Sequence, residues 1–399
     1  MEKDMQSYRL SDLVKIKNGK DHKMLSNGKY PVLGSGGIMR YVDKFLYDKP
    51  SVLLPRKGTL DNIQYCDMPF WTVDTLYYTE VNTNLANPYY LYRYLSLLDL
   101  SNLDSGTGVP SMTFDNYYGL KIFLPNIEKQ TKIAQILQTL DKKITINRQI
   151  NQNLEAMAKQ LYDYWFVQFD FPNENGKPYK SSGGKMVWNE KLKREIPKGW
   201  NVLKLGEHCS FNKRTSNGYF NHPILYLDTS NITNNTIDEL QFLNPSSDII
   251  PSRARRLVQE GDIVYSTVRP NLKHFGIIMN PDYNMVVSTG FAVITANWSA
   301  YRYFIYQFLI QAATIENLST IAQSAVSAYP SINTSDIENL DLVVPPDSMI
   351  EKYAKTACRL YLQIDTNYKE IKSLTKQRDE LLPLLMNGQV SVNSDLSLD

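Results

Sequence analysis

The sequence repeats one phrase at a constant separation. The segment GVPSMTFDNYYGLKIFLP begins at Gly108, and AYPSINTSDIENLDLVVP begins at Ala328. The same offset of 220 positions continues beyond the phrase, as far as Leu161 and Leu381. An internal duplication constrains the fold more than any single motif does, because each copy must form the same kind of structural unit. We therefore expect two similar globular regions, each followed by a similar long helix.

A long helical segment follows each copy of the phrase. Residues 127–167 contain neither glycine nor proline, and their apolar side chains recur at steps of three and four, as does the copy at 350–385. This is the pattern of a heptad repeat, and about 40 helical residues form a rod roughly 60 Å long. The short connection at 169–199 favours an antiparallel pair, although an extended linker could also span a parallel one. The predicted seam, the stripe through which the two helices would pair, comprises Leu140, Ile144, Asn147, Asn151, Leu154, Leu161, Leu360, Ile364, Ile371, Leu374 and Leu381.

Short apolar runs broken by glycine, proline and asparagine predict strands in both globular regions. One helix is expected at NPYYLYRYLSLL, where Asn87 can cap the helix and Pro88 can begin it. We expect an α+β fold in which two mixed α/β globular domains are separated by two long antiparallel coiled-coil helices, with a pseudo-twofold internal repeat. The expected ranges are 1–126 for the first globular domain, 127–168 for the central helix, 169–199 for a linker, 200–346 for the second globular domain, 347–388 for the C-terminal helix and 389–399 for a tail.

The bulk composition excludes several classes of protein. The formal net charge is only +2, so any binding to nucleic acid must come from local basic loops. Cys66, Cys209 and Cys358 lack CxxC spacing, which argues against a disulfide framework and against a zinc site. No apolar run approaches the roughly 20 residues of a membrane span. We expect a soluble protein of the reducing cytoplasm.

The sequence contains no convincing catalytic or cofactor motif. The string NPYY at Asn87 resembles the Asn/Asp-Pro-Pro-aromatic loop of adenine methyltransferases. Its second proline is missing, however, and no glycine-rich cofactor loop accompanies it, so a helix cap is the favoured interpretation. The histidines are scattered, and no GxSxG, Walker A or HExxH string occurs. We expect no catalytic residue, no bound cofactor and no metal site in this chain.

Polar and basic loops recur at matching places in the two globular regions. Arginine and lysine can bind phosphates or guanine, hydroxyl and amide side chains can read base edges, and glycine allows close approach to a duplex. For any one of these loops taken alone, an ordinary solvated turn is the favoured interpretation, but their recurrence in both copies favours recognition surfaces. The predicted DNA-binding residues are Ser35, Gly36, Gly37, Arg40, Tyr41, Arg56, Lys57, Gly58, Thr59, Ser105, Thr107, Ser111, Lys213, Arg214, Thr215, Thr229, Ser230, Asn231, Thr267, Arg269, Asn271, Lys273, Ser324, Ser327, Tyr329 and Ser331.

The first long helix ends in the aromatic string LYDYWFVQFDF, which carries more aromatic surface than one helix stripe needs. These rings either pack under the linker or form part of an interface with a partner protein. The residues predicted to bind a partner are Tyr164, Trp165 and Phe166.

Several of these segments together resemble one family, the specificity subunits of type I restriction-modification systems. The resemblance extends over nearly the whole chain, and it is carried by YPVLGSGGIMRYVDKF, LPRKGTLDNIQ, SGTGVPSMTFDNYYGLKIFLPNIEKQTKIAQIL, WFVQFDFPNENGKPYKSSGGKMVWNEKLKREIPKGW and GDIVYSTVRPN. One departure is that the second copy of the repeated phrase, AQSAVSAYPSINTS, lacks the two glycines of SGTGVPS.

The resemblance implies a function for each part of the chain. It implies two target recognition domains, each reading one half of a split DNA sequence, and antiparallel helices that hold them apart. It also implies that the chain has no catalytic activity and works with double-stranded DNA, two methyltransferase (modification) subunits and restriction/translocase subunits. S-adenosylmethionine and ATP with magnesium would then be bound by the partners. A second interpretation from another class remains open, namely a two-headed scaffold whose globular regions bind proteins and not DNA.

Overall fold

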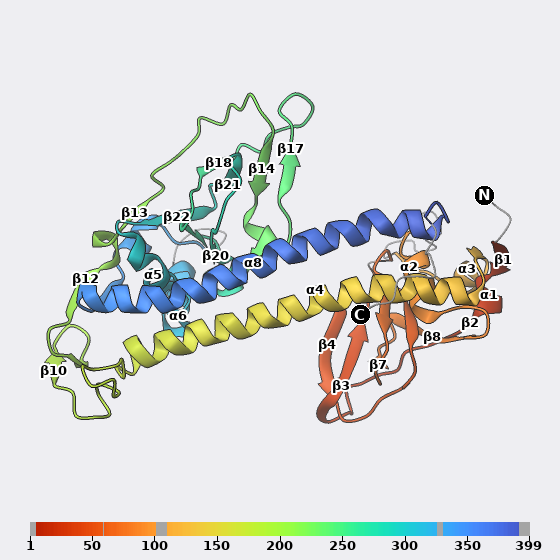
Figure 1. The fold of residues 1–399 in the computed structure, drawn as a ribbon, viewed down its shortest axis with the longest axis horizontal. Helices are drawn as coiled ribbons and strands as arrows, with labels where there is room; N and C mark the ends of the chain where they lie inside the picture. Colours follow the sequence, from red (N-terminus) through yellow and green to blue (C-terminus); the bar gives the residue numbers. More distant parts are fainter. Residues whose placement is uncertain (1–4, 59, 101–109, 325–329, 391–399) are drawn as a thin grey trace. The chain divides into compact units, whose positions relative to one another are not determined.

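The structure, a computed structural model, describes residues 5–58, 60–100, 110–324 and 330–390. The chain divides into two compact units (Figure 1): unit 1 comprises residues 1–147 and 370–399, and unit 2 comprises residues 148–369. Each unit thus contains one globular region together with part of both long helices. The units are defined by contacts between residues and combine separate stretches of the chain. They therefore do not test the predicted domain ranges, which stay a prediction.

Unit 1 is a small mixed α/β domain. Its strands form a four-stranded antiparallel sheet in the order β2-β8-β5-β6, a three-stranded sheet in the order β4-β3-β7 and the pair β1-β9. The elements are β1 (Gln6–Arg9), α1 (Leu10–Leu13), β2 (Val14–Lys17), β3 (Asn27–Gly34), β4 (Gly37–Val42), β5 (Ser51–Pro55), β6 (Gln64–Cys66), β7 (Trp71–Thr72), β8 (Leu76–Val81), α2 (Pro88–Leu95), α3 (Phe114–Tyr118), β9 (Lys121–Leu124) and the first part of α4 (Ile127–Tyr162).

Helix α2 covers the inner strand β5, all of whose residues are buried. The Asn87 side chain accepts hydrogen bonds from the amides of Tyr89 and Tyr90, and Pro88 occupies the first turn, which confirms the predicted cap. The core of unit 1 also includes Leu137 of α4 and Leu382 of α8. The globular region therefore buries its helical face directly against both long helices.

Unit 2 contains a second copy of this architecture and has additional strands. Its strands form two four-stranded sheets, in the orders β13-β22-β19-β20 and β17-β14-β21-β18, and the pairs β12-β23, β10-β11 and β15-β16. The elements are η2, a π-helical turn (Asp163–Val167), β10 (Met186–Asn189), β11 (Arg194–Pro197), β12 (Asn201–Lys204), η3 (Leu205–Glu207), β13 (Cys209–Phe211), β14 (Ile224–Leu227), η4 (Thr229–Asn231), β15 (Ile232–Thr233), β16 (Thr236–Ile237), β17 (Gln241–Leu243), β18 (Ala254–Leu257), β19 (Ile263–Ser266), η5 (Pro270–Leu272), β20 (Phe275–Ile277), β21 (Met285–Ser288), β22 (Phe291–Ala296), η6 (Ser299–Tyr301), α5 (Arg302–Leu309), α6 (Ala312–Ser324), α7 (Thr334–Glu338), β23 (Asp341–Val344) and α8 (Asp347–Met386), whose last part belongs to unit 1.

The two units share a set of corresponding elements. The pair β1-β9 corresponds to β12-β23, the sheet β2-β8-β5-β6 to β13-β22-β19-β20, α2 to α5 and α3 to α7. Leu124 pairs with Gln6 at one end of the β1-β9 ladder, and Val344 pairs with Asn201 at the same end of the β12-β23 ladder. Leu124 and Val344 are 220 positions apart. The predicted α+β fold with an internal repeat is confirmed.

The two long helices pack antiparallel within each unit. In unit 2, the amide nitrogen of the Asn367 side chain donates to the Asn151 side chain at 2.8 Å. Further along α4, the ring of Tyr162 lies 6.4 Å from that of Tyr353, so positions rise on α4 as they fall on α8. In unit 1, Asp141 of α4 forms an ion pair with Arg378 of α8. The predicted antiparallel pairing is confirmed in both units.

The buried face of the long helices is wider than the predicted seam. Of the predicted residues, Ile144, Asn151, Ile364, Ile371 and Leu374 are buried, whereas Leu140, Asn147, Leu154, Leu161, Leu360 and Leu381 are only half-buried. Tyr162, Tyr361 and Leu382, each next to a predicted position, are buried instead. The reason is that each helix packs against a globular region as well as against the other helix. Among the helices that the structure describes, none is long and apolar enough to cross a membrane.

The aromatic end of α4 packs inside unit 2. Trp165 and Phe166 lie in the turn η2 and are buried, and the ring of Phe166 lies 4.7 Å from that of Phe304 and 4.9 Å from that of Tyr353. The prediction that Tyr164, Trp165 and Phe166 bind a partner is therefore corrected for two of them, because their rings are occupied by the core. Only Tyr164 is exposed.

Candidate nucleic-acid interface

Two of the loops predicted to bind DNA pair with each other in unit 1. The amide of Gly58 donates to the carbonyl of Pro110 at 3.0 Å, and the amide of Met112 donates to the carbonyl of Arg56 at 3.0 Å. Lys57 and Ser111 lie opposite each other between these bonds as an isolated antiparallel bridge. We call this pair of main-chain bonds the loop ladder.

The turn between β3 and β4 joins the same loops. The Asn62 side chain donates to the carbonyl of Ser35 at 2.6 Å, and a Cβ atom added to Gly58 would lie 3.3 Å from the Ser35 hydroxyl oxygen. By contrast, a Cβ atom added to Gly36 or Gly37 would meet no other atom within 4 Å. The glycine turn therefore lies beside the loop ladder and leaves its own backbone open to a large ligand.

Unit 2 contains the same loop ladder. The amide of Arg269 donates to the carbonyl of Pro330 at 2.9 Å, and the amide of Ile332 donates to the carbonyl of Thr267 at 2.8 Å. Val268 and Ser331 form the isolated bridge between them. In both units, the loop after an inner strand thus contacts the segment that contains the repeated sequence.

The two ladders match residue by residue, and this comparison exposes a strained arginine. Gly58 has a φ of +90°, and Arg269, which takes the same place in unit 2, has a φ of +48°. Glycine adopts such left-handed values freely, whereas a residue with a side chain loses roughly 1–2 kcal/mol. Lys273, at the other end of the turn η5, has a φ of +59°. Strain of this kind is concentrated at functional sites, which supports the hypothesis that the loop from Arg269 to Lys273 binds DNA.

A third loop of unit 2 joins its ladder through Gly290. Thr267 donates to the Gly290 carbonyl through both its amide, at 2.9 Å, and its hydroxyl, at 3.0 Å. A Cβ atom added to Gly290 would lie 2.8 Å from the Thr229 methyl carbon. Gly290 therefore lies between the loops that contain Thr229 and Thr267, and a larger residue at this position would displace the Thr229 side chain.

Some of the predicted basic side chains are already bound within the protein. Arg214 forms an ion pair at 2.6 Å with Asp262, which is fully buried. One guanidinium nitrogen of Arg40 donates to the Leu25 carbonyl, and one of Arg56 donates to the Asp74 carbonyl at 3.3 Å. Direct DNA contacts by these three arginines stay predictions.

The other predicted residues differ in exposure. Tyr41, Lys57, Lys213, Thr215, Ser230, Arg269, Asn271, Lys273 and Ser324 are exposed, and Asn231 is half-buried. Thr59, Ser105, Thr107, Ser327 and Tyr329 lie outside the described residues.

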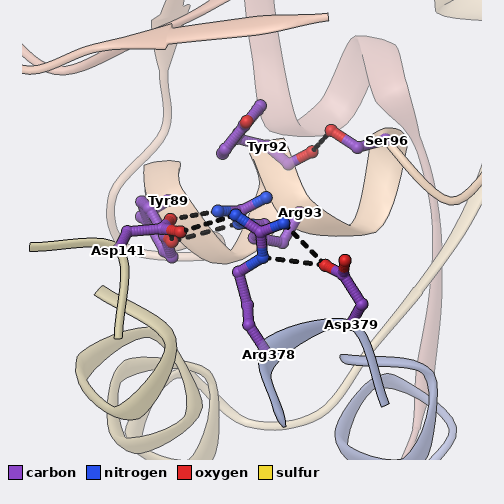
Figure 2. Close-up of polar contacts among 7 residues, drawn as sticks. All are labelled: Tyr89, Tyr92, Arg93, Ser96, Asp141, Arg378 and Asp379. Atoms are coloured by element: carbon purple, nitrogen blue, oxygen red, sulfur yellow. Dashed lines mark hydrogen bonds and ion pairs between the residues drawn. The ribbon is translucent and has the colours of Figure 1, made fainter. Parts of the chain in front are cut away.

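Each globular region is fixed to the long helices by a buried polar contact. In unit 1, Asp141 of α4 accepts hydrogen bonds from Tyr89 and Arg93 of α2 and from Arg378 of α8 (Figure 2). Burial opposes ionisation of this carboxyl group, but the hydrogen bonds from Tyr89, Arg378 and Arg93, together with the charge of Arg93, hold its pKa below the ordinary value. The carboxylate of Asp141 thus ties α2 to both long helices.

Unit 2 makes the same junction without charge. Tyr303 of α5 stacks on Tyr361 of α8 with ring centroids 4.8 Å apart, and Gln307 donates to the Tyr361 hydroxyl at 2.8 Å. A second junction starts from the turn between β15 and β16, because the Asn235 side chain donates to Glu155 of α4 at 3.0 Å. Burial raises the pKa of this glutamate. These contacts could not be read from the sequence, since the partners lie between 54 and 80 positions apart.

Comparison with known proteins identifies the family. A family described as the type I restriction modification DNA specificity domain matches residues 2–156 and 197–376, which is more than half of the chain. The specificity subunit of the type I restriction enzyme MjaIX from Methanocaldococcus jannaschii is 27% identical over 315 residues, which cover 76% of this chain and 68% of that protein. The specificity subunit of the type I restriction enzyme HindI from Haemophilus influenzae is 23% identical over 390 residues, which cover 81% of this chain and 82% of that protein.

A solved structure has the same fold. The S subunit of a type I restriction-modification system from M. genitalium matches with a TM-score of 0.59 and 17% identity, over 96% of each chain. Two regions of the chain match the family, and the fold contains two copies of one domain. On this evidence, the chain belongs to the family of type I restriction-modification DNA specificity subunits.

Proposed function

We propose that this chain reads a split DNA target, with the loops of unit 1 binding one half-site and the loops of unit 2 binding the other. The observation that carries the proposal is the loop ladder. Independently in each unit, it brings together the basic and polar loops that the sequence predicts to bind DNA. One residue with positive φ lies at the same place in both ladders, Gly58 in unit 1 and Arg269 in unit 2, as expected where a backbone must approach a duplex closely.

The catalytic steps are assigned to partner subunits. We propose that two methyltransferase subunits bind S-adenosylmethionine and modify adenine, that restriction subunits use ATP and magnesium, and that the complex acts in the cytoplasm. Family membership and the exposed Tyr164 at the end of α4 support a role in assembly. The alternative, a scaffold whose globular regions bind only proteins, predicts no preference for any DNA sequence.

Selection from a randomised duplex library tests the proposed function. The full chain, alone and with the modification subunits of its system, is incubated with the library at several salt concentrations, and bound duplexes are sequenced. We expect a motif of two short conserved halves separated by a spacer of fixed length. Binding should weaken steeply as salt rises, because lysine and arginine displace counterions from phosphates. Selection of no motif under any of these conditions would contradict the proposal.

Two arginine variants then compare the units. We expect R56A and R269A each to weaken binding by about 1–3 kcal/mol if the arginine reads a guanine. The R56A variant should relax a position in one half of the motif, and R269A should relax a position in the other half. An equal loss on all sequences would instead indicate a phosphate contact, and relaxation of the same half by both variants would contradict the assignment of one half-site to each unit.

A further inference from the structure

The second sheet of unit 2 gathers its loops at one edge. Strands β14 and β21 are parallel, and β18 runs antiparallel to β21. The residues that follow β14 and β21 and the residue that precedes β18 therefore lie at the same edge. These are the segment from Asp228 to Asn231, the pair Thr289 and Gly290, and Arg253. The Thr289 amide donates to the Arg253 carbonyl at 2.8 Å, so Arg253 is fixed at this edge by its backbone.

Strand β18 and the residue before it carry three arginines, and two of them are used within the protein. The Arg255 guanidinium donates to the carbonyls of Ser252, at 3.0 Å, and Asn217, at 2.6 Å. The Arg256 guanidinium donates to the Thr215 hydroxyl at 3.1 Å. Arg253 is exposed, and within the described part of the chain its guanidinium makes no hydrogen bond or ion pair. The residue before β18 is thus an exposed arginine without a side-chain partner among the described residues, at the edge that also holds Thr229 and Gly290.

The turn that lies at the same edge as Arg253 is polar. Asp228 accepts hydrogen bonds from the hydroxyls of Tyr226, at 2.8 Å, and Thr229, at 3.0 Å, and from the Ser230 amide. These bonds fix the turn η4 and use both carboxylate oxygens. Burial raises the pKa of the Tyr226 hydroxyl to about 12, and the positive charge of Arg253 partly opposes this rise. The strand order places Arg253 at the same edge of the sheet as the Asp228 turn.

We propose that Arg253 is a specificity-determining residue of unit 2 and reads a guanine in the half-site that this unit binds. The inference rests on the proposed function, since it requires that unit 2 binds DNA through the loops at this edge. Arginine is suited to the role because its guanidinium can donate two parallel hydrogen bonds to the O6 and N7 atoms of guanine, the commonest specific contact in the major groove. The short backbone link to Thr289 limits the positions that the side chain can reach.

The randomised duplex library tests this inference on the full chain, with the R253A variant and a matched control. R359A also removes one exposed arginine of unit 2, but from the surface of α8 and not from the sheet edge. We expect R253A to lose preference for guanine at one position in one half of the motif, by roughly 5–150-fold, which corresponds to about 1–3 kcal/mol. The other half of the motif, the spacer and the melting temperature should not change, and R359A should select the same motif as the unmodified chain.

Three outcomes overturn the inference. The first is a motif for R253A that is identical to that of the unmodified chain. The second is a uniform loss of affinity on all sequences with a smaller salt dependence, because it identifies a phosphate contact. The third is an equal effect of R359A. In each of these cases the unmodified chain still selects a split motif, so the proposed function stands; if the unmodified chain selects none, the proposed function fails first.

Discussion

At the scale of single residues, the clearest difference between the two units lies where each globular region meets the helices. Unit 1 uses a carboxylate held between two arginines, Asp141 with Arg93 and Arg378 (Figure 2). Unit 2 replaces this cluster by the stacked rings of Tyr303 and Tyr361. Removing one partner of a buried ion pair costs far more than the pair contributes, because the remaining charge is left without compensation. The charged junction therefore makes unit 1 sensitive to changes that unit 2 tolerates.

The variant D141N should destabilise unit 1 by about 2–3 kcal/mol at pH 7, somewhat less than a fully buried pair would lose. The pKa of Asp141 is lower in the folded chain than its ordinary value of 3.8. Its contribution to stability is therefore complete above about pH 4 and is lost as the pH falls through the folded pKa. Denaturant unfolding of both proteins should show a difference at pH 7 that shrinks below pH 4.

Unit 2 provides the control for this experiment. The variant Y361F removes a neutral hydrogen bond, so we expect a loss of about 1 kcal/mol that is the same at pH 7 and below pH 4. A pH-independent effect of D141N would show that packing, and not charge, determines the stability of the junction in unit 1.

At the scale of elements, two buried asparagines join α4 to α8 in unit 2. Asn151 and Asn367 are 3% and 4% exposed. Asn367 donates to Asn151 at 2.8 Å, and Asn151 donates to the Ile364 carbonyl at 3.3 Å. A buried asparagine lowers stability but favours one register, because a shifted pairing leaves its amide without a partner. We infer that this pair fixes the alignment of the two helices.

A double-mutant cycle tests the role of the asparagine pair. The variants N151L and N367L should each lower stability by about 1–3 kcal/mol, since each leaves one buried amide unpaired. The double variant N151L/N367L should recover most of this loss, and its coupling energy is measured by chemical unfolding. If both single variants stabilise the chain, the pair contributes nothing to register.

The duplication, the cap of α2 and the pairing of α4 with α8 could be predicted because each depends on residues close in sequence or on a regular period. The set of residues in the helix interface could be predicted only in part. Periodicity identifies one apolar stripe, whereas Tyr162, Tyr361 and Leu382 are buried by globular regions whose docking no local pattern shows. Which of Arg253 and Arg256 hydrogen-bonds within the protein could not be predicted either, because Thr215, the acceptor for Arg256, lies 41 positions away from it.

At the scale of the whole molecule, both long helices run from one unit into the other, as the unit boundaries fall after residues 147 and 369. Under the proposed function, the length of these helices would set the distance between the two half-sites. Each helical residue adds ~1.5 Å, so removing seven residues shortens a helix by roughly 10 Å, or about three base pairs of duplex at ~3.4 Å each.

A matched deletion tests this dependence on helix length. Removing residues 142–148 from α4 and 369–375 from α8 keeps both the Asp141–Arg378 ion pair and the Asn151–Asn367 pair. Library selection should then show a shorter preferred spacer, or loss of the joined motif, whereas each half-site tested alone keeps its base preferences. Replacing the same residues by other helix-forming sequences of equal length serves as the control. An unchanged spacer after the deletion would exclude the helices as its determinant.

The loop ladder has an evolutionary consequence. Its bonds join main-chain atoms only, at Arg56 to Gly58 in one unit and Thr267 to Arg269 in the other, and the residues at all three positions differ between the copies. Mutation can therefore exchange these side chains, and with them the preferred bases, without dismantling the framework that presents them. A chain built in this way can acquire new targets through substitutions that leave its folding intact, and each half of the target can diverge independently.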